Sequence, residues 1–406
     1  MSLHVLEKLA ATNPDCEIWW DSSPLIYEGW KASVLKDAPA GKRADWEAQL
    51  SRLFDAETAA RDGTMGFRGV TTNPPLSLQA IQADPAFWAD EIRKIASTRN
   101  ADDVEDIYWA VYLDVVRRGA AMIRKVFDAS RGKYGYVSGQ VDPRFVTDKT
   151  RMLEQALQLA EIAPNVMVKI PGSKEGYEVI EELTARGIST NNTTSFTVPQ
   201  YVACMDAVSS GLGRARAAGV DLSKWRSVIT HMSSRLGNVG DLKAQADARG
   251  IALSPEEILL GEMAVLKRAY RYGKDRNHPS KMLQCSMRVQ DEGAGGKASS
   301  GHIALIAGGD FVYTCPPGYI AQLMKAEDRL PDFDPAAIDT DASAELIEKL
   351  LRIPYFRQAY EFDGMKPEEF SRFGAFAATA AEFAAATRKT VDFVAQSVET
   401  LHRRVA

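Results

Sequence analysis

The chain has 406 residues, of which 45% are hydrophobic and 25% are charged, and its formal net charge is −5. This composition is typical of a globular protein with a large core, and it gives no electrostatic reason to expect binding to nucleic acid or an anionic membrane. No apolar run approaches the roughly 20 residues that a membrane-spanning helix needs. A local basic pocket for an anionic substrate is compatible with this overall charge.

The start of the chain and its cysteines indicate a cytoplasmic protein. Residues 1–14 lack the basic and apolar regions of a secretory signal. The cysteines are widely spaced and form no CxxC or Cys/His ligand pattern, which fits reduced thiols. They are Cys16, Cys204, Cys285 and Cys315. The histidines form no HExxH or comparable pattern, so we expect no metal site.

Short apolar runs alternate with amphipathic segments along most of the chain. In chain order, the runs predict strands at 16–22, 66–73, 134–141, 165–171, 188–193, 226–232, 281–288 and 310–315. The segments between them predict helices at 107–130, 147–162, 174–186, 198–217, 239–273 and near 302–308. Strands that alternate with helices in this way favour a closed parallel (β/α)₈ TIM barrel over an open doubly wound sheet. No GxGxxG follows the first strand, so dinucleotide binding has no support.

The remaining residues flank the predicted barrel. We expect an N-terminal extension over 1–15, a catalytic barrel over 16–320 and a C-terminal helical extension over 321–406. In the C-terminal extension, apolar residues from Phe376 to Leu401 recur at three- and four-residue spacing. We expect this stripe to pack on the outer helices of the barrel. The alternative is a contact between subunits, which would make the protein a homodimer.

Lys169 is the residue that says most about function. It lies in the apolar, β-branched run 165–171, which predicts a buried strand. Burial disfavours the ammonium form, so the pKa of a buried lysine falls and its neutral amine can attack a carbonyl group to form a Schiff base. The alternative is a strand-end lysine whose stem is buried and whose charged head reaches water or a carboxylate.

Polar residues stand at the ends of the predicted strands, where (β/α)₈ barrels carry their reactive groups. Each could have a local structural role, such as capping a turn or bonding to the backbone. Their joint arrangement around a carbonyl-reactive lysine favours an active site. In chain order they are Asp21, Asn73, Ser138 with Gln140, Lys169, Asn191 with Thr193, Thr230 with Arg235, and Ser286 with Arg288.

At these residues the chain resembles the transaldolase family of Schiff-base (β/α)₈ enzymes. The resemblance spans about 16–320, and the order and spacing of the matching stretches are preserved. These stretches are 69–74 (GVTTNP), 138–144 (SGQVDPR), 166–171 (VMVKIP), Gly187 and Ile188 followed by Asn191 and Thr193, and 286–288 (SMR). The resemblance implies phosphorylated ketose and aldose substrates and a reaction that needs no cofactor.

The resemblance also implies a role for each matching catalytic position. Lys169 matches the Schiff-base lysine, and Asp21 matches the acid/base that handles the hydroxyl proton during C–C cleavage. Asn73 and Asn191 match residues that hydrogen-bond donor hydroxyl groups. Thr193 matches the residue that orients the catalytic water, so these roles are expected on four different strands.

A second group of positions is expected to bind the substrate. Arg235, Ser286 and Arg288 match a phosphate-binding set, and guanidinium groups suit the geometry of phosphate oxygens. Ser138 and Thr230 are further substrate-binding candidates at strand ends. Two cations at the mouth of the pocket would hold a phosphate and leave the substrate carbonyl over the lysine amine.

The chain departs from the family pattern at several places. Gln140 stands where transaldolases usually have a glutamate that works with the water of carbinolamine dehydration. An amide can position that water but cannot exchange its proton, and glutamine here resembles the fructose-6-phosphate aldolase-like members. Met232 replaces an aromatic residue, Ser234 replaces a glycine, and 290–301 is a Gly-rich insertion.

Three functions therefore stay open at this point. The first is a transaldolase that moves a dihydroxyacetone unit between sugar phosphates. The second, suggested by Gln140, is a lyase with the same Schiff-base chemistry that releases or adds the free ketone. The third is a sugar-phosphate-binding barrel without turnover. An assay with an acceptor aldehyde separates the first two, and covalent trapping of the lysine separates both from the third.

Overall fold

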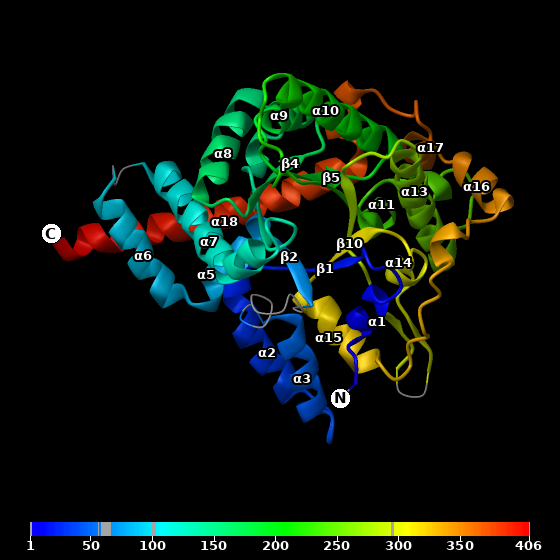
Figure 1. Ribbon diagram of the computed structural model, residues 1–406, viewed down its shortest axis with the longest axis horizontal. Coiled ribbons are helices and arrows are strands. Elements are labelled where there is room, and N and C mark those ends of the chain that lie inside the picture. Colours follow the sequence, from blue (N-terminus) through cyan, green and yellow to red (C-terminus); the bar gives the residue numbers. More distant parts are fainter. Residues whose placement is uncertain (1, 56, 58–65, 100–102, 294–295, 406) are drawn as a thin grey trace.

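The computed structural model describes residues 2–55, 57, 66–99, 103–293 and 296–405, with side chains up to residue 399. Parallel strands form a closed barrel in the order β1-β10-β7-β6-β5-β4-β3-β2, with helices around it (Figure 1). This confirms the predicted (β/α)₈ TIM barrel with additional C-terminal helices. The strands are β1 (Glu17–Asp21), β2 (Phe67–Thr71), β3 (Tyr136–Gln140), β4 (Val166–Pro171), β5 (Thr190–Ser195), β6 (Ser227–Met232), β7 (Lys281–Cys285) and β10 (Phe311–Cys315).

Helices connect consecutive strands. From β2 to β5 they are α5 (Pro74–Ala83), α6 (Pro85–Ser97), α7 (Val104–Ala129), η2 (Pro143–Phe145), α8 (Lys149–Ile162) and α9 (Lys174–Ala185). After β5 come α10 (Val198–Ala217), α11 (Ser233–Asn238), α12 (Leu242–Asp247), α13 (Pro255–Asp275), α14 (Gly301–Ala304) and α15 (Pro317–Ala326). Within the described residues, no helix is both long and apolar enough to cross a bilayer.

Capping side chains fix the points at which barrel strands turn into helices. Asn73, Ser173 and Thr197 each follow closely on the end of a strand, β2, β4 and β5 respectively. The side chain of each accepts a hydrogen bond from the backbone amide three residues further on, which satisfies a free donor of the helix that begins there. The caps therefore hold the strand ends, where the candidate reactive groups lie, in fixed positions.

The segment predicted as one helix over 239–273 is divided in the structure. It contains the short helix α12, and the long helix α13 begins only at Pro255. Gly250 lies between them with a φ of 65°, a left-handed conformation that favours glycine and ends helical structure. Ser254 then caps α13, with a proline in its first turn. The apolar periodicity that suggested one helix comes from two helices that pack on the same core.

The ends of two predicted strands also differ. β5 lies at 190–195 rather than 188–193. β7 ends at Cys285 rather than Arg288, because Ser286 has a φ of 58° and cannot continue the strand. The insertion at 290–301 forms a hairpin of β8 (Gln290–Asp291) and β9 (Ala298–Ser299), a pair that the sequence analysis did not predict. Its central residues, 294 and 295, lie outside the described part.

The register of the central strands brings polar residues to one level of the barrel. Lys169 of β4 lies opposite Gln140 of β3 on one side and Asn191 of β5 on the other. Strands β3, β4, β5 and β6 are buried at every position. Polar groups at these positions must therefore find partners inside the protein.

The last helix closes over the barrel. It follows η3 (Ala337–Asp339), α16 (Ala344–Leu351), α17 (Pro354–Tyr360) and η4 (Pro367–Arg372), and it is the long helix α18 (Gly374–Val405). Figure 1 shows α18, in red, running past α7 towards the C-terminus beside α6. It packs on α5, α6, α7 and η2, and it also contacts β5. Phe376, Phe383, Val394 and Val398 of the apolar stripe are buried in these contacts, whereas Leu401 lies beyond the described side chains.

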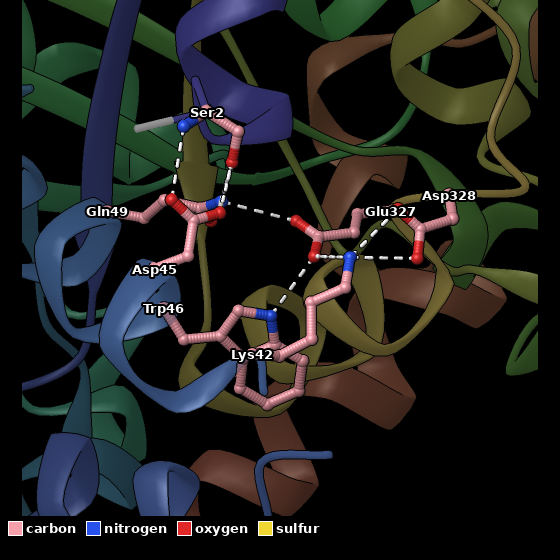
Figure 2. A network of polar contacts seen from close by, with 7 residues as sticks. All are labelled: Ser2, Lys42, Asp45, Trp46, Gln49, Glu327 and Asp328. Carbon is pink, nitrogen blue, oxygen red and sulfur yellow. Dashed lines mark hydrogen bonds and ion pairs between the residues drawn. The ribbon is translucent and has the colours of Figure 1, made fainter. Parts of the chain in front are cut away.

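The N-terminal residues form α1 (Val5–Ala10), η1 (Pro24–Ile26), α2 (Tyr27–Lys36) and α3 (Arg43–Leu53). Figure 2 shows a polar network that joins α3 to the end of α15. The Lys42 ammonium lies 2.8 Å from a carboxylate oxygen of Glu327 and 2.8 Å from one of Asp328. Trp46 Nε1 and Gln49 Nε2 donate to the same Glu327 carboxylate, at 3.1 and 3.3 Å. The network therefore fixes the N-terminal helices to α15, the helix that follows the closing strand β10.

Candidate active site

A cavity of about 240 Å³ lies at the carboxyl ends of the barrel strands. This is the end where (β/α)₈ barrels carry their active sites, so the cavity is the candidate active site. Among the residues singled out from the sequence, its lining includes Asp21, Asn73, Lys169, Thr193, Thr230, Arg235 and Ser286. Further described lining residues are Thr71, Pro75, Leu76, Gln79, Met232, Leu283, Cys285, Thr314, Pro316, Glu382 and Phe383.

Lys169 stands on β4, in the wall of this cavity. Its exposed fraction is 5%, and its Nζ donates a hydrogen bond to the backbone carbonyl of Thr72, 3.1 Å away. Burial lowers the pKa of the Lys169 ammonium, and the nearby charge of Asp21 opposes this shift. A single carbonyl partner does not neutralise an ammonium group as a carboxylate would. The site therefore favours the neutral, nucleophilic amine more than an exposed lysine does.

Asp21 ends β1 and lines the same cavity. Burial raises the pKa of its carboxyl group, while the charge of Lys169 and a hydrogen bond from Thr71 oppose the rise. In that bond the Thr71 hydroxyl donates to Asp21 Oδ1 over 2.6 Å, and the Thr71 and Thr314 hydroxyl oxygens are 2.5 Å apart. The carboxyl group is therefore held in one orientation, and it takes up a proton more readily than an exposed aspartate does.

Asn191 of β5 is held by hydroxyl groups from β3 and from the neighbouring strand β6. Its Nδ2 donates to Ser138 Oγ over 2.8 Å, and Thr230 donates to its Oδ1 over 2.8 Å. All three side chains are buried, and of the three only Thr230 belongs to the described lining of the cavity. After the end of β2, Asn73 uses its Oδ1 to cap α5, accepting from Leu76 at 2.9 Å, which leaves its amide NH₂ group for other partners.

Gln140 and Thr193 each present a buried oxygen atom without a partner. No described residue hydrogen-bonds to Gln140 Oε1 or to Thr193 Oγ1. The Gln140 backbone amide is fixed by a hydrogen bond to the Tyr112 hydroxyl, at 2.8 Å. Next to Thr193, the pairing of β5 with β6 is irregular and Thr194 has a φ of 54°, a strained conformation typical of functional sites. Buried polar atoms are nearly always hydrogen-bonded, so these two oxygens are suited to a bound water or hydroxyl group.

The residues predicted to bind phosphate do not all face the cavity. Arg235, on α11, and Ser286, after β7, belong to its lining. Arg288 is absent from the described lining, and its guanidinium donates to the backbone carbonyl of Ser234 at 3.3 Å. Arg288 also lies 3.8 Å from the buried carboxylate of Glu262. The structure therefore brings together two members of the predicted set and leaves the third at the side.

Several lining residues were missed by the sequence analysis. Thr314 is the last residue but one of β10, the eighth strand of the barrel, where the argument from strand ends could have found it. Thr71 lies within the GVTTNP stretch, although no role was given to it. Glu382 lies on α18, where only the apolar stripe gave a signal.

The cavity lining also includes the thiol of Cys285. Burial raises the pKa of the Cys285 thiol to about 12, so this thiol stays protonated and does not compete with the amine as a nucleophile.

A larger hollow, of about 590 Å³, lies at the opposite end of the barrel. Its floor includes Glu17, which is buried between the cations Arg226 and Lys281. Lys281 also pairs with Asp310, so these charges neutralise one another, and the amino-terminal face of such barrels generally serves stability. We therefore place the chemistry at the smaller cavity, which holds the buried lysine.

The fold and the cavity together define a (β/α)₈ barrel protein with a buried lysine among polar strand ends. The chain belongs to the transaldolase/fructose-6-phosphate aldolase family, whose sequence model matches residues 58–366. This confirms the resemblance that the sequence motifs indicated. The strand that carries Asp21 and the helix that carries Glu382 both lie outside the matched residues.

Curated relatives agree with this assignment. A transaldolase of Thiobacillus denitrificans is 32% identical over 237 residues, which are 57% of this chain and 64% of the relative. Transaldolase 1 of Streptomyces coelicolor is 37% identical over 218 residues, 53% of this chain and 55% of the relative. A transaldolase of Mycolicibacterium smegmatis is 37% identical over 204 residues, 49% of this chain and 54% of the relative. In each case the aligned part spans less than two thirds of the relative's length.

Proposed function

We propose that this chain is a transaldolase-like transferase that moves a dihydroxyacetone unit between sugar phosphates through a Schiff base on Lys169. The observation that carries the proposal is the lysine itself. It is buried, its pKa is lowered, and it shares its cavity with the carboxyl group of Asp21. The family assignment and the relatives named transaldolase support the same reaction.

The reaction begins at the carbonyl group of a ketose phosphate. The neutral amine of Lys169 attacks the C2 carbon, and the resulting carbinolamine loses water to give an iminium ion. The cation withdraws electrons from the neighbouring bonds, as a metal or a cofactor does in other enzymes. Lys169 therefore supplies the electrophilic group that the later steps need.

Cleavage then requires a base for the C4 hydroxyl group. Asp21 takes that proton as the C3–C4 bond breaks, the bonding electrons pass to the iminium, and an aldose phosphate leaves. The three-carbon unit stays on Lys169 as an enamine. The enamine attacks the aldehyde carbon of an acceptor, and Asp21 returns the proton to the new hydroxyl group. Water finally hydrolyses the imine and frees the lysine.

Gln140 and Thr193 are proposed to handle the water of imine formation and hydrolysis. Both present buried oxygen atoms without a described partner. A water held by these atoms would lie beside Lys169, because Gln140 is the register partner of Lys169 on β3. Asn73, Asn191, Ser138 and Thr230 are proposed to bind donor hydroxyl groups. Arg235 and Ser286, with Arg288 at the side, are proposed to receive the phosphate.

A transfer assay tests this function. A ketose phosphate donor is incubated with the protein and an aldose phosphate acceptor, and the new ketose phosphate is quantified by mass. We expect the new ketose only when the acceptor is present, and we expect none with Lys169→Arg, because a guanidinium stays protonated and cannot form a stable imine. No new ketose with any donor and acceptor pair would contradict the transferase.

The second candidate is a lyase of the fructose-6-phosphate aldolase kind, and Gln140 favours it. In that reaction the enamine is protonated to an iminium ion, water hydrolyses the bond to Lys169 and the free ketone leaves, so no acceptor is consumed. The same assay decides, because a lyase produces free dihydroxyacetone without an acceptor. Transfer that strongly exceeds release would support the transferase.

Two further proposals concern where and how the chain works. The four cysteines are all free in the structure, which supports a reducing compartment such as the cytoplasm.

The second of these proposals concerns the domains. We assign the reaction to the barrel, 16–320, and we propose that the helical extension, 321–406, covers the carboxyl end of the barrel. The side chains of Glu382 and Phe383 in the cavity lining support this division of roles.

A further inference from the structure

We infer that Glu382 is a specificity-determining residue of this site. Its carboxylate acts as an internal counterion of Arg235, which the phosphate of a substrate must displace. The inference rests on the proposed function, because it takes Arg235 as a phosphate-binding group. It adds a residue from the C-terminal helix that lies outside the part of the chain matched by the family.

The two side chains meet in a paired geometry. Arg235 Nη1 lies 2.6 Å from Glu382 Oε2, and Arg235 Nη2 lies 3.0 Å from Glu382 Oε1. Two parallel N–H···O bonds of this kind are also the contacts that a guanidinium makes with a phosphate group. The carboxylate therefore occupies the donors that the substrate would use.

Three residues on one face of α18 contact the Arg235 guanidinium. Thr379 Oγ1 accepts from Arg235 Nη1 at 3.3 Å, and the centre of the Phe383 ring lies 5.8 Å from the Arg235 guanidinium carbon. Residues three and four apart lie on the same side of a helix, so Thr379, Glu382 and Phe383 point the same way. Thr379 and Phe383 are buried, and they fix this face of α18 against the cavity. The packing of α18 therefore fixes the position of Glu382 at the mouth of the cavity.

The two partners differ in how freely they can turn away from the contact. The Glu382 side chain is 53% exposed, whereas the Arg235 side chain is 20% exposed. A half-exposed carboxylate can turn into water at little cost, because exposed ion pairs contribute little net stability. Arg235 stays in the cavity wall. An entering phosphate can therefore exchange with Glu382 without any rearrangement of the barrel.

This exchange sets the selectivity of the site. A phosphate group must displace the Glu382 carboxylate to bind Arg235, whereas a neutral sugar makes no use of Arg235 and displaces nothing. The counterion thus weakens the binding of phosphorylated substrates and leaves the binding of dephosphorylated ones unchanged. It therefore sets how strongly the site prefers a phosphorylated substrate.

The test compares Glu382→Gln and Glu382→Ala with the wild type in the full chain. Asp392→Asn is the matched control, because it removes an exposed carboxylate from the same helix, away from the cavity lining. We measure kcat and KM for a phosphorylated ketose and for its dephosphorylated analogue, and inhibition by inorganic phosphate at constant ionic strength. Both Glu382 variants should bind phosphate and phosphorylated ketose about two- to fivefold more tightly, as expected for loss of a partly exposed ion pair. The KM of the dephosphorylated ketose and all constants of Asp392→Asn should stay unchanged.

Two results would overturn the inference. A rise in KM for the phosphorylated ketose would mean that Glu382 holds Arg235 in its binding position, and unchanged constants would mean that the pair has no part in binding. Borohydride trapping of Lys169 with the phosphorylated ketose is run on every variant. If wild type gives no adduct, the proposed function fails. If the adduct forms and the KM pattern is absent, the role of Glu382 alone fails.

Discussion

Lys169 and Asp21 line one cavity, and burial shifts the pKa of each group towards its neutral form. The charge of each residue opposes the shift of the other, so the two titrations are coupled. In the proposed reaction an iminium ion forms on Lys169 and restores a positive charge beside Asp21. That charge favours the carboxylate form of Asp21 at the step in which it acts as a base.

The pH dependence of imine formation should report the lowered pKa of Lys169. The rate of trapping with borohydride should rise with pH and level off below about 10.4, the ordinary pKa of lysine, because the neutral amine is the nucleophile. In Asp21→Asn the carboxylate that supports the ammonium is absent, so the profile should move to lower pH. The measurement is the adduct yield by intact mass after short pulses at each pH. A profile that levels off only near the ordinary lysine pKa would show that burial does not activate the amine.

Asp21→Asn should separate C–C cleavage from imine formation. An amide cannot take the hydroxyl proton, so kcat should fall by roughly 10²–10⁴, the usual span for a lost acid/base group. The imine should still form, because Lys169 is intact. Asp15→Asn, which neutralises an exposed carboxylate just before β1, is the control and should leave kcat unchanged. Equal loss of trapping and turnover in Asp21→Asn would mean that Asp21 is structural.

Arg235 and Arg288 should differ in their effect on substrate binding. Arg235 lines the cavity, so Arg235→Ala should raise KM for phosphorylated substrates about ten- to hundredfold, as expected for a charge-assisted contact of about 1.5–3 kcal/mol. Arg288 bonds to a backbone carbonyl outside the described lining, so Arg288→Ala should have the smaller effect. Dephosphorylated analogues should show little change with either variant. If neither variant responds to the phosphate, the substrate is not a sugar phosphate or another group holds it.

Much of the barrel could be predicted because its strands carry strong local signals. The run around Lys169 is apolar and β-branched, and β4 lies within the predicted range. Asn73 and Thr193 could be placed at strand ends because the carboxyl ends of parallel strands must meet at one edge of the barrel. The end of β7 could not be predicted, because a serine does not indicate that the backbone adopts a left-handed conformation, as it does at Ser286.

The sequence alone could not predict that α18 contributes side chains to the cavity. Its apolar stripe indicated packing, but the residue that meets Arg235 lies between stripe positions and looks like an ordinary solvent-facing glutamate. Arg235 and Glu382 are 147 positions apart in the sequence, and only the path of the chain through η4 brings the helix over the mouth. Such long-range ion pairs have no local pattern.

Gln140 should control the fate of the enamine without abolishing imine chemistry. A glutamine can hold water but cannot exchange its proton, so Gln140→Glu should change the rate of imine formation or hydrolysis. It should also shift the ratio of transfer to free-ketone release. A variant with a shortened 290–301 hairpin provides a comparison, since a closing segment can shield an enamine from water. Identical product ratios in wild type and both variants, with and without acceptor aldehyde, would show that neither feature governs partitioning.

The central claim is that Lys169 forms a Schiff base with a ketose phosphate, and intact-mass measurement after borohydride reduction tests it most directly. We expect one substrate-derived mass increment, located by peptide mapping on the peptide that carries Lys169. Lys174→Arg, which changes a nearby half-buried lysine paired with Glu368, should give the same adduct, and Lys169→Arg should give none. Modification at Lys174 in place of Lys169, or no adduct with any ketose phosphate, would contradict the mechanism.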